Sequence, residues 1–280
     1  MDNPEQEPIE LPAPQVQLGE PSLPATEPFA WQPAVRVFPP WSGFDVLAVA
    51  GFTVAAVFLG SMLALGVAHV ATAGRHVPIT ELATNTVVLI GGQMAAYPAV
   101  ILFMMSLVRN RSHERFWRAI QWKWQGVTGL RFLAYGVAFA LAVEYASQYL
   151  PIPKSLPVDK YFNETAGAYL MAAFGISLAP LLEELFFRGM LYPVMRRAVG
   201  VTPAVLFTAT TFAFIHGAQL GYAWAPLLSI FVVGVVFTLV REHTGSVAAS
   251  FLMHCGYNFA LFAMLWIDSD HFLHLEKAMS

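Results

Sequence analysis

Seven long apolar segments are the feature that most constrains the fold of this chain. They lie near residues 45–71, 85–108, 130–150, 167–190, 202–219, 224–241 and 246–267. A helix of about 18 or more apolar residues is long enough to cross a bilayer. Hydrophobic residues make up 57% of the chain and charged residues 12%, which is unlike a soluble globular protein. We therefore predict an all-α fold, a polytopic transmembrane helix bundle with about seven spans, of which the fifth is the weakest because it is short and polar.

The two ends of the chain differ from this apolar middle. Residues 1–40 contain ten of the 19 prolines, six acidic residues and one basic residue. Such a composition cannot bury a core, so we predict a disordered Pro/Glu-rich cytoplasmic tail there. We place the helical bundle at residues 41–270 and a short C-terminal tail at residues 271–280.

The basic residues predict an orientation in the membrane. With seven spans, the N-terminal tail and the loops at 109–129, 191–201 and 241–245 share one side. That side carries ten of the 15 Lys and Arg residues, the other side carries four, and Arg188 lies within a span. Because basic loops stay in the cytoplasm, the N-terminus should be cytoplasmic. We expect a multi-pass protein of the bacterial inner membrane, and at a net charge of −3 we expect no nucleic-acid partner.

Between the second and third apolar segments, residues 115–124 mix three basic residues with three tryptophans. This pattern is typical of an amphipathic helix that lies in the membrane interface. A basic loop with an aromatic belt explains the same composition, and both interpretations stay open.

Three ionisable residues, Glu183, Glu184 and Arg188, lie within two turns of the fourth apolar segment. A charge at membrane depth costs about 2.5–3.5 kcal/mol, so such residues usually have a function. Glu184 and Arg188 are four residues apart and can pair on one helix face. Glu183 is rotated by about 100° and can face another group. Taken alone, the pair is equally well explained as a structural ion pair.

Two later apolar segments carry further polar residues. His216 lies in the fifth, and His254 and Asn258 lie four residues apart in the seventh. At 1.5 Å per residue, these groups reach the same depths as the two glutamates, which predicts one buried site. A buried glutamate near a histidine can act as a general base on water, and a histidine with an asparagine can donate hydrogen bonds to an oxyanion.

Zinc is an alternative for the same site. Glu183, His216 and His254 form a common zinc ligand set. The positive charge of Arg188 and the weak ligand Asn258 favour hydrolysis without a required cofactor. The residues by themselves leave both versions open.

Taken in order, these motifs resemble those of a known family. They are Glu-Glu-x-x-x-Arg at 183–188, Phe-x-x-x-His at 212–216 and His-x-x-x-Asn at 254–258. They are similar to the three motifs of the CAAX protease and bacteriocin-processing family (CPBP, also called Abi or Rce1-like), a family of intramembrane endopeptidases. The resemblance covers roughly residues 165–267.

The resemblance implies a role for each residue. Glu183 and His216 would activate the water, Glu184 and Arg188 would support them, and His254 and Asn258 would stabilise the oxyanion. It also implies a substrate that is a membrane-anchored or lipidated protein or peptide. The family's best-known eukaryotic members remove the last three residues of prenylated proteins.

Two other functions fit the same residues. A non-catalytic immunity or scaffold protein of this family would retain the site without turnover. A transporter would also place Glu, Arg and His inside the membrane, but it predicts an inverted repeat, which the two halves of the chain do not show. Outside the motifs, we interpret Cys255 as a packing residue and Glu144 as a structural residue near the outer end of the third segment.

Overall fold

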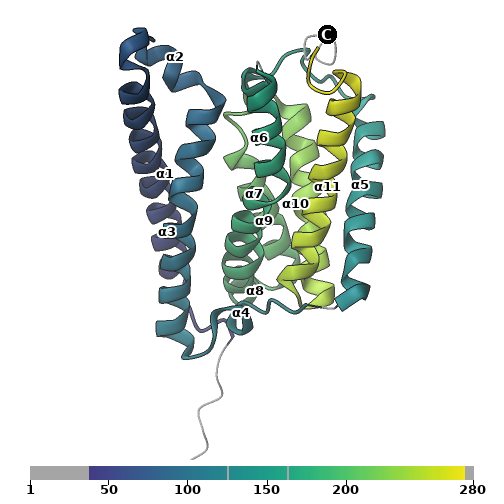
Figure 1. Cartoon of the computed structure of the whole chain (residues 1–280). Helices are drawn as coiled ribbons and strands as arrows, with labels where there is room; N and C mark the ends of the chain where they lie inside the picture. The colour runs from purple at the N-terminus through teal and green to yellow at the C-terminus, as the bar shows by residue number, and fades with distance from the viewer. Residues whose placement is uncertain (1–37, 125, 163, 275–280) are drawn as a thin grey trace, which may run out of the picture. The chain divides into compact units, whose positions relative to one another are not determined.

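All regular structure in the part of the chain that the structure describes is helical, which confirms the predicted all-α class. The computed structural model describes residues 38–124, 126–162 and 164–274, and these belong to one compact unit (Figure 1). The tails predicted at 1–40 and 271–280 lie outside the described residues, apart from 38–40 and 271–274. The elements are α1 (Gly43–Thr72), η1 (Ala73–Arg75), α2 (Ile79–Thr84), α3 (Thr86–Ser112), α4 (Phe116–Ala119), η2 (Gly126–Leu130), α5 (Arg131–Ser147), η3 (Pro157–Phe162), α6 (Thr165–Ile176), α7 (Leu178–Glu184), η4 (Leu185–Leu191), α8 (Tyr192–Val199), α9 (Val201–Ile215), α10 (Trp224–Thr244) and α11 (Val247–Asp268).

Helices cover all seven predicted segments, but within the described residues five runs are long and apolar enough to cross a membrane. These runs are Gly43–Arg75, Thr86–Ser112, Thr165–Val199, Trp224–Thr244 and Val247–Asp268. The third and fifth predicted segments form α5 and α9, which have 17 and 15 residues. α5 ends before the prolines at 151 and 153, and α9 ends at Ile215, after which His216, a glycine and a series of turns follow.

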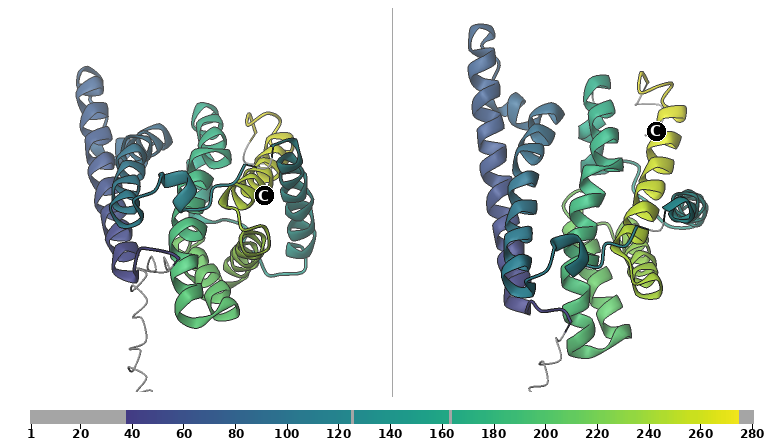
Figure 2. Two further views of the ribbon diagram at one scale, coloured as in Figure 1. Left: turned by 90° about the horizontal axis from the view of Figure 1, so that it is seen from below. Right: turned by 60° about the horizontal axis from the view of Figure 1, so that its bottom comes forward.

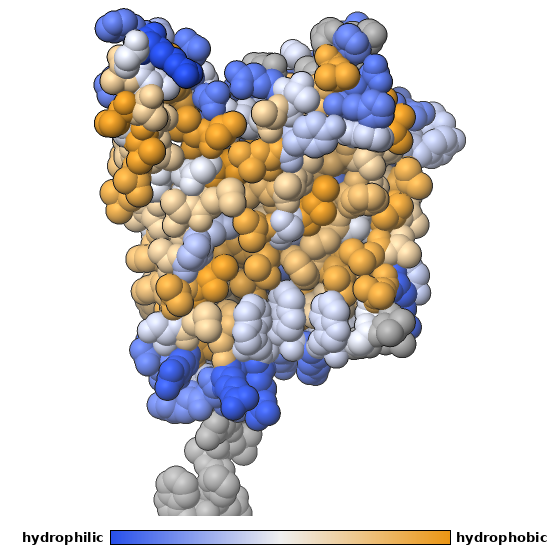
Figure 3. All heavy atoms as spheres, in the orientation of Figure 1, coloured by the Kyte–Doolittle hydropathy of each residue, from blue (hydrophilic) through white to orange (hydrophobic). Residues whose placement is uncertain are grey.

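The distribution of hydrophobic side chains on the surface is typical of a membrane protein. On the face drawn in Figure 3, hydrophobic side chains cover the middle of the helices, and hydrophilic side chains gather at the two ends. Large apolar side chains such as Phe44, Val54, Phe58 and Val70 are more than half exposed. A soluble monomer rarely exposes so much continuous apolar surface. The chain is therefore an integral membrane protein of the polytopic helical class.

The helices associate in pairs through glycines. α1 packs against α3, and α5 packs against α11 (Figures 1 and 2). A Cβ atom on Gly136 of α5 would lie 2.1 Å from the Met253 carbonyl oxygen, and one on Gly256 of α11 would lie 2.2 Å from the Leu133 carbonyl oxygen. Small residues allow two backbones to approach closely in a membrane. The position of α11, which carries His254, therefore depends on these two glycines.

A valine at position 136 is expected to weaken the fold. Its side chain would overlap the backbone of α11, so the helices must separate, at a cost of about 1–3 kcal/mol. Thermal unfolding of the Gly136→Val protein in detergent measures the effect. Gly51→Val is the matched control, because a Cβ atom there meets no atom within 4 Å. Equal melting temperatures for the two variants would contradict this account of the α5–α11 contact.

The fourth predicted segment is one long run that changes its helical form twice. α6 ends at Ile176, because Pro180 has no N–H to donate to the Ile176 carbonyl. After the seven residues of α7, η4 is a π-helix, in which hydrogen bonds join residues five apart. α8 then begins with a proline in its first turn. The three ionisable residues lie where α7 passes into the π-helix, and π-helical turns often occur at functional sites.

Contacts at one end of the helices join the segments that we predicted to share a side of the membrane. Arg197 of α8 donates to the backbone carbonyls of Pro39 and Trp41, just before α1. Arg111 at the end of α3 pairs with Asp45 in the first turn of α1 at 2.8 Å. The predicted interfacial helix at 115–124 is reduced to the four residues of α4, because Gln121 has a positive φ of 61° and turns the chain. The loop interpretation fits that segment better.

Candidate active site

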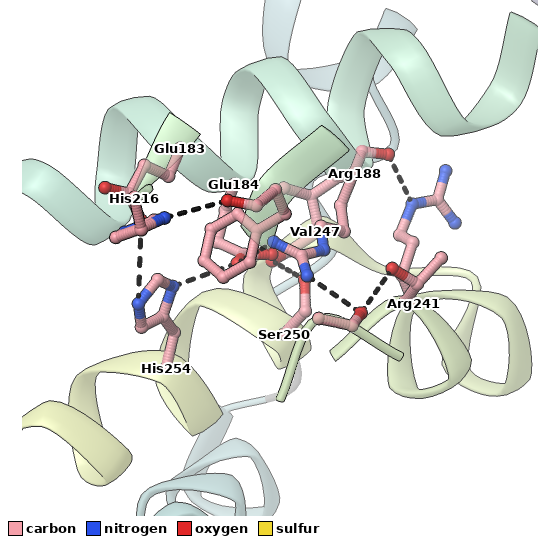
Figure 4. Close-up of polar contacts among 11 residues, drawn as sticks. Glu183, Glu184, Arg188, His216, Arg241, Val247, Ser250 and His254 are labelled. Carbon is pink, nitrogen blue, oxygen red and sulfur yellow. Dashed lines mark hydrogen bonds and ion pairs between the residues drawn. The ribbon is translucent and has the colours of Figure 1, made fainter. Parts of the chain in front are cut away.

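Glu184 and Arg188 form the buried ion pair that the four-residue spacing predicted. Arg188 Nη1 lies 2.8 Å from Glu184 Oε1, and both side chains are fully buried (Figure 4). Two opposite charges in contact offset part of the cost of burying each of them, and the loss of either partner leaves an uncompensated charge.

The rest of the Arg188 guanidinium is held by α9 and α10. Nη2 donates to the Gly234 carbonyl at 3.0 Å. The charged group also lies over the rings of Phe212 and Phe237, at 4.7 and 5.5 Å from their centres. A cation over an aromatic face is attracted to it, most strongly where water is excluded. These contacts keep Arg188 in one orientation between the helices.

His254 of α11 lies between the two glutamates. Its Nδ1 is 3.0 Å from Glu184 Oε1, and its Nε2 is 3.7 Å from Glu183 Oε2. Because a carboxylate oxygen only accepts, the Nδ1 atom carries the hydrogen in the first contact. The second distance is longer than a hydrogen bond. Glu184 thus accepts hydrogen bonds from both Arg188 and His254, whereas Glu183 faces the Nε2 atom of the His254 ring.

Glu183 differs from Glu184 in exposure. Its side chain is 20% exposed, whereas that of Glu184 is fully buried, and the recorded ion pair of Arg188 is with Glu184. The two neighbouring carboxylates therefore have different environments: one is neutralised and inaccessible, and the other is reachable. Pairs of carboxylates with different environments are common in acid–base sites.

His216 lies at the C-terminal end of α9, beside the same aromatic ring as His254. Its Nδ1 is 2.8 Å from the Phe212 carbonyl, so Nδ1 donates and Nε2 keeps its lone pair. The Phe212 ring centre is 4.8 Å from the His216 ring and 5.9 Å from the His254 ring. The predicted convergence of the three segments is thus present in the structure. In the structure the Glu183 carboxylate faces His254, whereas the family resemblance implied that Glu183 acts together with His216.

Asn258 lies one turn beyond His254 on α11, and it contacts the broken helix instead of the glutamates. Its Nδ2 donates to the Gly175 carbonyl at 2.7 Å, next to the break between α6 and α7. This interhelical hydrogen bond is the usual role of an asparagine in a membrane. The same nitrogen carries a second N–H, which can serve another acceptor.

The sequence reasoning missed several residues around the pair. Ser250, which is fully buried one turn before His254, lies beside the Glu184 carboxylate (Figure 4). Phe237 of α10 packs on both Arg188 and His254. Tyr97 of α3 lies within electrostatic range of Glu183 and donates to Gln93 at 3.3 Å. Of these three residues, only Tyr97 could have been found from the sequence, because Gln93 and Tyr97 are two polar residues four apart in an apolar segment.

The predicted zinc alternative requires Glu183, His216 and His254 to converge on one point. In the described part of the chain, no group of three or more His, Cys, Asp or Glu side chains is arranged so that it could hold a metal ion. His254 is instead drawn toward Glu184, beside the positive charge of Arg188. In this arrangement the three side chains do not fit a zinc site.

The two other residues that the sequence singled out lie outside the cluster. Glu144 is exposed on α5. Cys255 is a free thiol, half-buried on α11.

The fold and the site together define a polytopic helical membrane protein with a buried cluster of Glu, Arg and His between its helices. Residues 165–260 match the family model described as Rce1-like: type II CAAX prenyl endopeptidase Rce1-like. The match runs from α6 into α11 and contains all three motifs, and it bears out the predicted resemblance to the CPBP family over this part of the chain. No curated protein and no solved structure matches the chain.

Proposed function

We propose that this protein is an intramembrane endopeptidase that hydrolyses a peptide bond with a water molecule activated by Glu183. The observation that carries the proposal is the difference between the two neighbouring carboxylates. Glu184 is paired with Arg188 and fully buried, whereas Glu183 is partly exposed and faces the imidazole of His254. Glu183 is thus the carboxylate that can receive a proton from a water molecule. The proton would also reduce the net negative charge of the cluster, which a low-dielectric site favours.

In the proposed reaction, Glu183 takes one proton from water as the oxygen attacks the carbonyl carbon of the peptide bond. The C–N bond then breaks, and the proton passes from Glu183 to the leaving amine. His216, whose Nε2 keeps a lone pair, would orient the same water. Arg188 and Glu184 would hold His254 in place.

Two side chains on α11 would stabilise the negative charge on the carbonyl oxygen. We assign this role to the second N–H of Asn258 and to His254 Nε2, which donates only in the form of the ring that carries a hydrogen on both nitrogens, because Nδ1 already donates to Glu184. The first N–H of Asn258 fixes the side chain by its bond to Gly175. Removal of one oxyanion donor commonly lowers turnover by about 100- to 1,000-fold.

The substrate class follows from the depth of the site. A carboxylate between membrane helices meets peptides that are themselves held in the bilayer, so we propose a membrane-anchored or lipidated protein or peptide as substrate.

We also propose that the protein resides in a bacterial inner membrane with its N-terminus in the cytoplasm, on the basis of the ten-to-four distribution of basic residues. Efficient labelling of a cysteine placed at 113–120 by an impermeant reagent outside intact cells would contradict this orientation.

A cleavage assay in liposomes tests the proposed activity. The purified protein is expected to cleave a membrane-anchored peptide and to spare the same peptide without its anchor. The Glu183→Ala protein provides the blank. Because we favour hydrolysis without a required metal, a chelator is expected to leave the rate unchanged. Activity that is lost to the chelator and restored by zinc would favour a metalloprotease. No cleavage by folded wild-type protein of any anchored peptide in a broad panel would favour the non-catalytic alternative.

A further inference from the structure

The π-helix that carries Arg188 contains a backbone carbonyl whose helical partners are both missing. In an α-helix, the Arg188 carbonyl would accept from the N–H of Tyr192. That N–H instead donates to the Phe187 carbonyl, five residues back. In a continued π-helix, the donor would be residue 193, which is proline and has no N–H. A buried carbonyl without a donor is costly, so another part of the molecule must supply one.

Arg241 of α10 supplies the missing donor. Its Nε donates to the Arg188 carbonyl at 3.2 Å (Figure 4). Its Nη2 donates to Gln121 Oε1 at 2.6 Å. The residue is 4% exposed. Both donor contacts of this buried guanidinium go to residues outside α10, to Arg188 in η4 and to Gln121 after α4.

The contacts of Arg241 reach both helices that carry the cluster. Gln121, its second acceptor, also accepts through its backbone carbonyl from the N–H of Val247 at 3.2 Å. Val247 is the first residue of α11, two turns before His254. Arg241 thus joins the π-helix that presents Arg188 to the start of the helix that presents His254. On the other side of the π-helix, the indole of Trp41 donates to the Met190 carbonyl at 3.1 Å.

We propose that Arg241 is a positioning residue of this site: its guanidinium replaces the N–H that Pro193 lacks, and so holds the π-helical turn that directs Arg188 toward Glu184. The inference rests on the proposed function for its effect on catalysis. Without this donor, the turn relaxes and Arg188 rotates with it. Arg188 and His254 both bond to the Oε1 atom of Glu184, so a rotation of Arg188 disturbs all three side chains. Glu184 and His254 then lose their alignment with Glu183.

Two substitutions separate positioning from mere folding. Arg241→Met keeps the length of the side chain and removes every donor, and it should fold because it also removes a buried charge. We expect its kcat to fall by about 10- to 100-fold, the size of effect that a small misplacement of reacting groups produces, with KM within about twofold of the wild type. Arg241→Lys keeps a single donor nitrogen, which can reach one of the two acceptors, so it should recover part of kcat.

Arg196→Met is the matched control. Arg196 is also basic and lies at the same end of the helices, but it pairs with Glu242 at 2.9 Å, and its side chain is 52% exposed. Its guanidinium bonds to Glu242, and not to the Arg188 carbonyl or Gln121, so the kcat of Arg196→Met should equal that of the wild type. Equal losses in Arg196→Met and Arg241→Met, or no loss in either, would overturn the proposal.

Hydrogen–deuterium exchange keeps the inference separate from the proposed protease activity. In full-length protein in detergent, Arg241→Met is expected to speed amide exchange at least tenfold in peptides that cover 185–196, whereas Arg196→Met should leave it unchanged. This result would support the positioning role even if no peptide is cleaved. Unchanged exchange in Arg241→Met would refute it even if the wild-type protein proves to be an active protease.

Discussion

Replacing Glu183 with glutamine is expected to abolish cleavage and to leave the protein folded. Glutamine has nearly the same shape as glutamate, but it cannot accept a proton from water. Loss of a general base typically costs about 100- to 10,000-fold in rate. The fold should tolerate the change, because Glu183 is not the partner of Arg188 and its side chain is partly exposed. Turnover of an anchored peptide in liposomes, together with the melting temperature, measures both expectations.

The control for this substitution is another glutamate in an apolar helix. Glu144 of α5 is exposed and lies outside the cluster, so Glu144→Gln should cleave at the wild-type rate. A fully active Glu183→Gln protein would contradict the assignment of the base. Equal loss of activity in the two variants would show that the loss comes from a general effect of removing a glutamate.

Removing the charge of Arg188 is expected to give the largest loss of stability of any single substitution in the site. In Arg188→Met, the fully buried Glu184 carboxylate loses its ion pair, and the Gly234 carbonyl loses its donor. Breaking a buried pair by removing one partner costs about 3–5 kcal/mol. A cost of that size is a large fraction of the stability of an average protein, so the yield of folded protein should fall sharply. Denaturant unfolding in detergent measures the difference.

A second ion pair in the same chain provides the comparison. Arg111 pairs with Asp45 at the same 2.8 Å, but its side chain is 56% exposed. The Asp45 carboxylate is buried, but it also accepts from the Ser42 N–H and hydroxyl, so it keeps hydrogen bonds without Arg111. A pair with one solvated partner contributes about 1 kcal/mol, so Arg111→Met should lose much less stability than Arg188→Met. Combining Arg188→Met with Glu184→Leu removes both buried charges and should recover most of the lost stability without recovering cleavage. Similar costs for Arg188→Met and Arg111→Met would mean that burial does not decide the strength of these pairs.

Much of the fold could be predicted from the sequence because the membrane simplifies the problem. Long apolar segments must become helices at membrane depth, and the helices lie where those segments lie. Their lengths were harder to predict. The segments at 130–150 and 202–219 form helices of 17 and 15 residues, because turns and prolines at their ends shorten the regular structure. Hydropathy averages over a window and does not register such local ends.

The sequence by itself determined which segments bring polar residues to the site, and the tertiary structure decided which of those residues are in contact. A charge in an apolar helix must find a partner, so Glu184 with Arg188, and the histidines of two later helices, could be grouped by spacing and depth alone. The contact of His254 with both glutamates, the bond of Asn258 to Gly175 and the donor from Arg241 could not. They depend on a π-helical turn and a break at Ser177, which rotate the side chains away from the regular period of 3.6 residues. The missing N–H groups of Pro180 and Pro193 allow those irregular turns, but the donors that stabilise them come from helices distant in sequence, so only packing decides which residues supply them.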